Sequence, residues 1–172
     1  MELYVERGFE QTTVAEIAQR AGLTARTFFR HFTDKREVLF AGSEFLQEHV
    51  MTALAGAPAT ATPMEAAAVA LAAAADVLGR DREFSRHRQA IIGANPELRE
   101  RELSKLARMA EALAGGLRQR GTPDPDAALA AETAIVVLRV AFEQWLTAST
   151  DVDLAQVMTE SLTRLRRVTA AG

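Results

Sequence analysis

Residues 13–32 read TVAEIAQRAGLTARTFFRHF, and this stretch decides the fold that we predict. Thr13 followed three residues later by Glu16 matches a capping box, in which a hydroxyl and a carboxylate satisfy free N–H groups at a helix start. Gly22 allows the left-handed backbone of a tight turn, and Thr24 after it suits the cap of a second helix. A short helix, a turn and a second short helix form a helix-turn-helix, whose second helix enters the DNA major groove.

Apolar spacing separates a buried face from an exposed face in both helices. Ile17, Ala18 and Ala21 give the first helix an apolar face that a crossing helix can cover. Phe28 and Phe32 lie four residues apart on the second helix, so both are expected to face the core. The side chains then expected to face solvent are Ala25, Arg26, Thr27, Phe29, Arg30 and His31.

Positive charge gathers here although the chain as a whole carries a formal net charge of −3. Between Arg20 and Arg36 the sequence has five lysines and arginines and a single acid, Asp34. DNA carries one phosphate charge per about 1.7 Å of its axis, so a local cluster of cations gains free energy by releasing counterions. Asp34 or Thr33 would begin the next helix, whose first N–H groups beside Lys35 suit a phosphate.

A longer stretch, residues 8–40, resembles the DNA-binding module of the TetR (tetracycline-repressor-like) transcriptional regulators. The pattern of that family is a Gly-aromatic pair, a Thr-Thr step, Ile-Ala, Ala-Gly-hydrophobic, an aromatic pair, His-Phe, a lysine and an apolar pair. Its counterparts in this sequence are Gly8-Phe9, Thr12-Thr13, Ile17-Ala18, Ala21-Gly22-Leu23, Phe28-Phe29, His31-Phe32, Lys35 and Leu39-Phe40.

The resemblance implies which side chains meet DNA. It implies phosphate contacts from Thr13, His31 and Lys35. It also implies base or backbone contacts from the start of the second helix. These residues are Thr24, Ala25, Arg26 and Thr27. Arg26 is expected either to read the O6 and N7 atoms of a guanine or to lie solvated at the helix start.

Two features depart from the family pattern. Phe29 stands where the family often has a tyrosine that touches a phosphate, so Phe29 is expected to contact sugars or a thymine methyl group. The neighbouring Arg30 would then supply the phosphate contact. The first helix of the family normally begins further toward the N-terminus, so we expect residues 1–9, MELYVERGF, to hold only the last turns of a truncated helix.

The rest of the sequence predicts helices as well. Hydrophobic residues make up 48% of the chain, cysteine is absent, and no run alternates with the period of two that strands require. We therefore predict an all-α fold, with a three-helix helix-turn-helix module at residues 1–45 and a helical ligand-binding and dimerisation domain at residues 46–172. The expected helices span residues 1–7, 13–20, 24–31, 34–54, 63–79, 81–94, 96–120, 125–148 and 153–169.

The last two predicted helices carry large apolar surfaces. Residues 127–146, AALAAETAIVVLRVAFEQWL, are apolar almost all round, which fits a helix buried on more than one side. One stripe of the final helix needs a partner, and it consists of Leu154, Val157, Met158, Ser161, Leu162 and Leu165. The TetR resemblance implies that these helices pair with those of a second subunit, and that the resulting homodimer reads a near-palindromic operator.

A small-molecule pocket is expected in the larger domain. Its candidate walls, each of which can equally be plain core, are Phe45, Leu71, Phe84, Ile91, Met109, Leu138 and Phe142. Alanines along residues 63–79 leave room that favours an apolar or flat ligand. Arg139 interrupts an apolar run. It either pairs with Glu143 or Glu132 on its own helix, anchors an anion in the pocket, or forms an ion pair at an interface.

Neither catalysis nor metal binding is indicated. His31, His49 and His87 are far apart in sequence, and no glycine-rich phosphate loop precedes a strand. No run is long and apolar enough to span a bilayer, so we expect a soluble cytoplasmic protein that is not an enzyme and has no cofactor beyond a small-molecule effector. The function expected is that of a ligand-responsive DNA-binding regulator, most often a repressor in such families. The alternative is an all-helical small-molecule- or protein-binding module without sequence-specific DNA binding.

Overall fold

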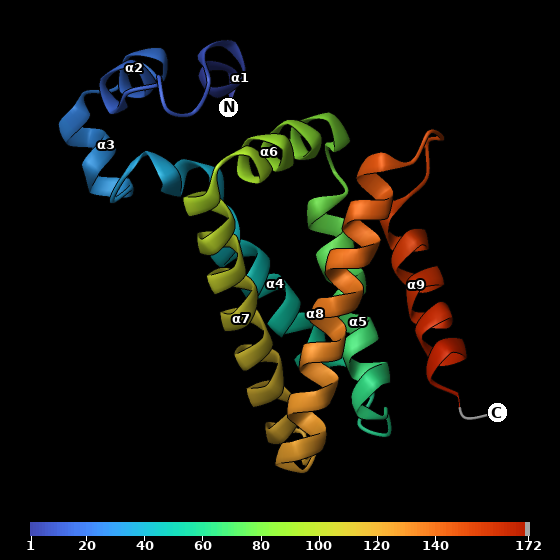
Figure 1. Cartoon of the computed structure of the whole chain (residues 1–172). Coiled ribbons are helices and arrows are strands. Elements are labelled where there is room, and N and C mark those ends of the chain that lie inside the picture. Colours follow the sequence, from blue (N-terminus) through green and yellow to red (C-terminus); the bar gives the residue numbers. More distant parts are fainter. Residues whose placement is uncertain (171–172) are drawn as a thin grey trace. The chain divides into compact units, whose positions relative to one another are not determined.

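The computed structural model describes residues 1–170, and every regular element in them is helical, as the sequence predicted (Figure 1). The contacts between elements divide the chain into two compact units. The first unit combines Met1–Ser43 with Glu83–Glu102, and the second combines Glu44–Arg82 with the chain from Leu103 onward. The predicted domains, residues 1–45 and 46–172, differ from these units in placing residues 83–102 in the second domain. The predicted domain boundary stays a prediction, and residues 171–172 lie outside the described part.

Most helix bounds agree with the predicted ranges to within one residue. The elements are α1 Glu2–Arg7, α2 Val14–Arg20, α3 Ala25–His31, the 3₁₀ helix η1 Lys35–Phe40, α4 Ser43–Gly56, α5 Pro63–Leu78, α6 Arg82–Ala94, α7 Pro96–Gln119, α8 Asp124–Thr147 and α9 Leu154–Thr169.

The single long helix predicted over residues 34–54 was wrong, because the chain forms η1 and then begins α4 anew. Asp34 caps η1, since its carboxylate accepts hydrogen bonds from the N–H groups of Arg36 at 2.8 Å and Glu37 at 3.2 Å. The Ser43 hydroxyl donates to the Phe40 carbonyl at 2.6 Å, at the point where α4 starts. These side-chain bonds replace the main-chain bonds that a continuous helix would make.

The core of the first unit is small and built around aromatic rings. It consists of Tyr4, Phe9, Leu39, Phe40, Ile92 and Leu98. The rings of Tyr4 and Phe9 lie 5.3 Å apart, and the Tyr4 hydroxyl donates to the Lys35 carbonyl at 2.6 Å. Burial raises the pKa of Tyr4 well above its ordinary value, so the hydroxyl keeps its proton and remains a donor.

One buried cation connects the later segment of the first unit to its core. The Arg88 guanidinium donates to the Leu39 carbonyl at 2.8 Å, lies 5.1 Å from the centre of the Phe40 ring and pairs with Glu102 at 3.2 Å. Burial lowers the pKa of Arg88, although Glu102 opposes this effect. Removing Glu102 alone would therefore leave a desolvated charge without its carboxylate.

The core of the second unit is rich in alanine. α5, α8 and α9 pack against one another, and residues of α4 and α7 complete the same apolar cluster (Figure 1). Ala67, Ala127, Ala134 and Ala141 are fully buried, since small side chains let helix backbones approach closely. Within residues 1–170, no helix combines the length and apolar character that crossing a membrane demands.

The apolar stripe of α9 finds its partner in the same chain. Leu154, Val157, Met158 and Ser161 are buried, and α9 packs on both α5 and α8. The family resemblance implied that the partner of this stripe lies in a second subunit. The structure shows that α9 buries most of its apolar face in its own core, which leaves mainly polar side chains facing outward.

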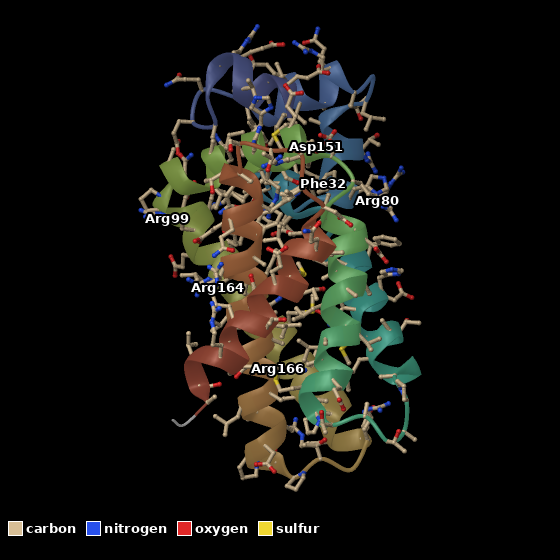
Figure 2. The ribbon with its side chains drawn as sticks, turned by 90° about the vertical axis from the view of Figure 1, so that its right-hand side faces the viewer. Phe32, Arg80, Arg99, Asp151, Arg164 and Arg166 are labelled. Atoms are coloured by element: carbon tan, nitrogen blue, oxygen red, sulfur yellow. The ribbon has the colours of Figure 1, made fainter. Side chains whose placement is uncertain are left out.

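Arg82 holds the connection between α8 and α9. Its guanidinium donates to the carbonyls of Ala148 at 2.7 Å and Thr150 at 2.9 Å, and to that of Trp145. The Trp145 indole in turn donates to the Val152 carbonyl at 2.9 Å. Figure 2 labels Asp151 within this connection, and Arg164 and Arg166 on the helix that follows. The cation also interacts favourably with the negative end of the α8 helix dipole, which lies at the C-terminal end of the helix.

Candidate nucleic-acid interface

Local interactions fix the helix-turn-helix as the sequence predicted. The capping box is present: Thr13 Oγ1 accepts from the Glu16 N–H at 3.3 Å, and the Glu16 carboxylate accepts from the Thr13 N–H at 2.8 Å. Gly22 has a φ of 68°, a left-handed value that glycine adopts without strain. Thr24 Oγ1 accepts from the Thr27 N–H at 3.2 Å and caps α3. The helix starts and the turn are therefore set by residues within the segment itself.

Packing orients the face that α3 presents. Phe28 is 3% exposed and its ring centre lies 5.2 Å from that of Phe32, which is half-buried. Ala18 of α2 is 2% exposed where the two helices meet. Truncating Phe28 to alanine would destabilise the fold by about 3–5 kcal/mol, the usual effect of removing a large aromatic from a core. Buried residues thus hold α3 with its other side toward solvent.

The outward side of α3 holds most of the residues predicted to meet DNA. Thr27 is half-buried, and the exposed members are Thr24, Ala25, Arg26, Phe29, Arg30 and His31. Phe29 is 57% exposed and meets Phe28 edge to face at 5.5 Å. α3 contains no acidic residue, so no carboxylate of its own opposes an approaching phosphate.

The two arginines of α3 are available to a ligand. Among residues 1–170, Arg26 makes no hydrogen bond or ion pair, and it stands one turn before Arg30 on the same side of α3. Arg30 Nη2 lies 3.4 Å from His31 Nε2, which accepts this N–H only when the imidazole is neutral. The free cationic surface of the helix-turn-helix is therefore centred on these two guanidinium groups.

Lys35, by contrast, is fully engaged inside its own unit. Its ammonium donates to the carbonyls of Phe9 at 2.9 Å, Glu10 at 3.1 Å and Thr12 at 3.2 Å, and it lies 4.5 Å from the centre of the Phe9 ring. An ammonium has three N–H donors, so a phosphate contact at Lys35 would have to displace one of these carbonyls. Lys35 therefore fastens the loop between α1 and α2.

Carboxylates neutralise the remaining cations of the segment. Arg20 pairs with Glu2 at 2.9 Å and Glu6 at 3.2 Å, and its pairing with Glu6 lowers the pKa of that carboxyl. Arg36 pairs with Glu97 at 2.9 Å and Asp34 at 3.3 Å. The five cations counted from the sequence therefore reduce to two free ones, because carboxylates pair with Arg20 and Arg36 and backbone carbonyls occupy Lys35.

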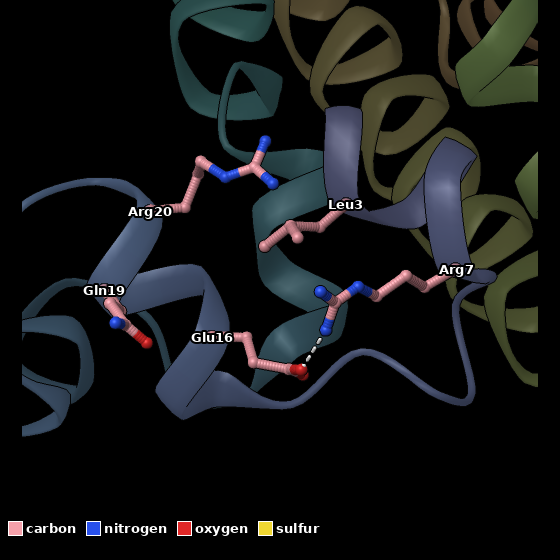
Figure 3. A pocket seen from close by; sticks show the side chains of 5 residues that line it. All are labelled: Leu3, Arg7, Glu16, Gln19 and Arg20. Carbon is pink, nitrogen blue, oxygen red and sulfur yellow. Dashed lines mark hydrogen bonds and ion pairs between the residues drawn. The ribbon is translucent and has the colours of Figure 1, made fainter.

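A shallow surface hollow lies beside these ion pairs. It is lined by Leu3, Arg7, Glu16, Gln19 and Arg20 (Figure 3). Arg7 pairs with Glu16 across it, and Figure 3 draws this contact as a dashed line. Hydrogen bonds from Thr13 lower the pKa of Glu16, with a smaller contribution from the charge of Arg7. The cations of this hollow already have partners, so it is not a free anion site.

Four of the seven candidate pocket residues share the apolar core of the second unit. Leu71, Met109 and Leu138 are buried in the core of the second unit, where Phe142 is half-buried. Ile91 packs against the core of the first unit. The other two candidates, Phe45 and Phe84, are about half exposed.

The structure also decides where Arg139 lies. It is exposed on α8 and makes no hydrogen bond or ion pair with other residues in the range 1–170, so the expected pairs with Glu132 and Glu143 are absent. No group of three or more histidines, aspartates and glutamates among the described residues is placed to hold a metal ion.

Comparison with known families finds matches along most of the chain. Residues 1–41 match the family described as bacterial regulatory proteins, tetR family. Residues 61–170 match the family described as the MftR C-terminal domain.

Among curated proteins, the chain is similar to the HTH-type transcriptional regulator TcmR of Streptomyces glaucescens, with 40% identity over 83 residues. That alignment covers 48% of this chain and 35% of TcmR, so the matched part spans about a third of the relative.

Two solved structures resemble the chain over nearly its whole length. One is the TetR family transcriptional regulator PfmR from Thermus thermophilus, with 25% identity and a TM-score of 0.59, covering 99% of this chain and 96% of that one. The other is FadR from Thermus thermophilus, a TetR family transcriptional repressor in complex with lauroyl-CoA. It has 24% identity and a TM-score of 0.61, covering 100% and 92%, and it supports the fold alone.

Proposed function

This chain belongs to the TetR family of bacterial regulatory proteins, and on that premise we propose that it is a ligand-responsive transcriptional repressor that binds a near-palindromic operator as a homodimer. The family consists of regulators and not enzymes. The observation that carries the proposal is the outward face of α3, with exposed Arg26 and Arg30, no acid, and a buried Phe28 behind it. We place this activity in the cytoplasm.

We assign the DNA contacts by side-chain availability. Arg26, near the start of α3, is placed to donate to guanine O6 and N7 in the major groove. Arg30 one turn later supplies a phosphate contact, and the exposed Phe29 ring contacts sugars or a thymine methyl group. Short side chains at the helix start let the backbone approach the bases, and these are Thr24, Ala25 and Thr27.

The phosphate contacts implied by the family resemblance stay predictions. His31 is exposed and reaches solvent. The Thr13 hydroxyl lies 2.8 Å from the Glu16 carboxylate and also accepts the Glu16 N–H, so it serves first as a helix cap. Lys35 serves first as the fastening of the loop between α1 and α2. Thr13 and Lys35 can meet DNA only by giving up some of these bonds.

The second unit is proposed to receive the effector. A small apolar or flat molecule held among the alanine-rich helices would favour one conformation of the dimer over another. Release of DNA requires that this conformation fit the operator less well. By linkage, operator DNA then weakens effector binding by the same factor. No cofactor other than this effector is proposed.

A gel-shift titration with DNA from beside its own gene tests the proposal. A repressor of this kind retards that DNA at concentrations that leave scrambled DNA free, and log K falls steeply with log salt because phosphate contacts release counterions. Weak, sequence-blind binding that salt abolishes would instead favour the alternative, an all-helical small-molecule- or protein-binding module.

A further inference from the structure

Five charged side chains form a chain of ion pairs, which we call the charge ladder, at the start of η1. In order along the ladder they are Glu97, Arg36, Asp34, Arg101 and Glu37. The distances between successive members are 2.9 Å, 3.3 Å, 3.5 Å and 2.5 Å. Because the signs of the charges alternate, every neighbouring pair attracts.

The charge ladder joins two segments of the first unit that are far apart in the sequence. Asp34, Arg36 and Glu37 belong to the start of η1, whereas Glu97 and Arg101 lie one turn apart on one face of α7. Their side chains are between 23% and 45% exposed, so water and salt weaken each pair. Several directed contacts between charges nevertheless favour one register of η1 on α7.

Buried contacts join the same two segments without the charge ladder. Leu98, which lies between the two ladder residues of α7, is fully buried and shares a core with Leu39 and Phe40 of η1. Arg88 of α6 donates to the Leu39 carbonyl at 2.8 Å. The first unit should therefore stay folded when one pair of the ladder is removed, and the orientation of η1 should be what loosens.

The charge ladder follows directly after the helix proposed to read DNA. α3 ends at His31, and only Phe32 and Thr33 separate it from Asp34. Phe32, labelled in Figure 2, and Asp34 both have extended backbones, with φ values of −132° and −157°. α3 and η1 are therefore separate helices, and the direction of α3 depends on what holds Asp34.

Lys35 fastens the other side of this junction. Its ammonium holds the carbonyls of Phe9, Glu10 and Thr12 in the loop that leads into α2, and α2 packs on α3. The start of η1 is thus fixed to the α2 side by Lys35 and to α7 by the charge ladder. Both helices of the helix-turn-helix take their orientation relative to the start of α7 from this junction.

We propose that Asp34 and Arg101 are positioning residues that set which half-site spacing this protein accepts in its operator. In a homodimer each α3 meets its half-site at one separation and one rotation, and an added base pair changes these by about 3.4 Å and about 35°. A helix-turn-helix held firmly on α7 rejects the altered spacing, whereas a loosened one follows it. This inference rests on the DNA-binding homodimer of the proposed function, and it concerns residues that act without contacting DNA.

Operators that differ by one base pair test the inference. The two segments protected in a footprint of DNA from beside its own gene define the half-sites, and one base pair is inserted or removed between them. By fluorescence anisotropy, the unaltered protein should bind the changed operators at least about tenfold more weakly than the original. For Arg101→Gln this spacing penalty should shrink about fivefold, the most that an ion pair at this exposure contributes.

Three further variants separate positioning from a general loss of stability. Asparagine can still accept the N–H bonds that cap η1, so Asp34→Asn removes the charge and should shrink the spacing penalty as Arg101→Gln does. Arg101→Lys keeps the charge and should retain most of the penalty. Arg99→Gln is the matched control on α7, since Arg99, labelled in Figure 2, is exposed and its side chain makes no hydrogen bond or ion pair within residues 1–170. It should leave the penalty unchanged.

Arg101→Gln and Asp34→Asn should also keep the base preference and the salt slope of the unaltered protein, because neither side chain reads a base or meets a phosphate. A module that is only destabilised would instead lose affinity for all operators alike. Far-UV circular dichroism checks that every variant is folded.

The inference is overturned, with DNA binding intact, if both variants keep the full spacing penalty or lose affinity equally on all operators, or if the unaltered protein is indifferent to spacing. An unaltered protein that retards none of this DNA would overturn both the inference and the proposed function.

Discussion

Replacing Lys35 by methionine separates two roles that the sequence alone could not distinguish: stabilising the fold and contacting a DNA phosphate. Methionine keeps an apolar stem of similar length but has no ammonium, so the carbonyls of Phe9, Glu10 and Thr12 lose their donor. Three charge-assisted bonds at a partly exposed site are worth about 1 kcal/mol each, and the cation over the Phe9 ring adds about 0.5 kcal/mol. We expect Lys35→Met to lower the free energy of unfolding by about 3.5 kcal/mol.

Arg30→Met is the matched comparison, since its guanidinium has no carboxylate partner within the described residues. We expect it to leave the unfolding free energy unchanged to within about 0.5 kcal/mol. It should nevertheless flatten the dependence of log K for DNA on log salt by about 0.9, the value of one phosphate contact.

Urea unfolding followed by circular dichroism measures the free energy of unfolding. Fluorescence anisotropy measures DNA binding at several salt concentrations, in buffer without urea, where each variant is folded. For Lys35→Met the salt slope should match that of the unaltered protein, because the lysine is occupied within its own unit. The reasoning is refuted if Lys35→Met unfolds like the unaltered protein and its salt slope drops by about one.

Three further predictions concern the same unit. Arg26→Ala should relax the preference for one base pair at a cost of about 1–3 kcal/mol, measured by competition with operators altered one pair at a time; an equal loss on all sequences would contradict base reading. Arg20→Gln should leave the salt slope of DNA binding unchanged, whereas the double variant Glu2→Gln with Glu6→Gln frees Arg20 and should steepen that slope. A flatter slope in Arg20→Gln, with no change in the double variant, would contradict the pairing of Arg20 with Glu2 and Glu6. Hydrogen bonds from Thr13 lower the pKa of Glu16 below its ordinary 4.5, so its stabilisation is present above that pH and is lost as pH falls through the lower folded value. Glu16→Gln should therefore reduce the slope of the acid-unfolding curve below pH 4.5, and an unchanged slope would show that the carboxylate contributes nothing.

Local chemistry explains which parts of the fold the sequence could predict. The caps at Thr13 and Thr24 and the turn at Gly22 depend on residues within four positions, and all three are present in the structure. Leu23, the apolar residue of the Ala21-Gly22-Leu23 motif, is nevertheless 46% exposed, because the burial of a residue just after a turn depends on which helix crosses it.

Contacts between distant residues explain what could not be predicted. The charge of Arg36 is balanced by Glu97, and Lys35 is occupied by carbonyls more than twenty positions away. No local pattern marks such partners, so a count of charges in the segment overstated the free cationic surface. Glu2 and Glu6 weakly indicated that a cation pairs with them, since their spacing of four residues places both on one face of α1.

The most direct test of the central claim, that the exposed face of α3 reads DNA, is hydroxyl-radical footprinting of the protein on DNA from beside its own gene. We expect two protected segments of inverted, related sequence, with centres one helical turn or a small multiple of it apart. Arg26→Ala should weaken both segments equally. Uniform protection along the DNA, no protection at all, or a footprint unaffected by both Arg26→Ala and Arg30→Met would contradict the account.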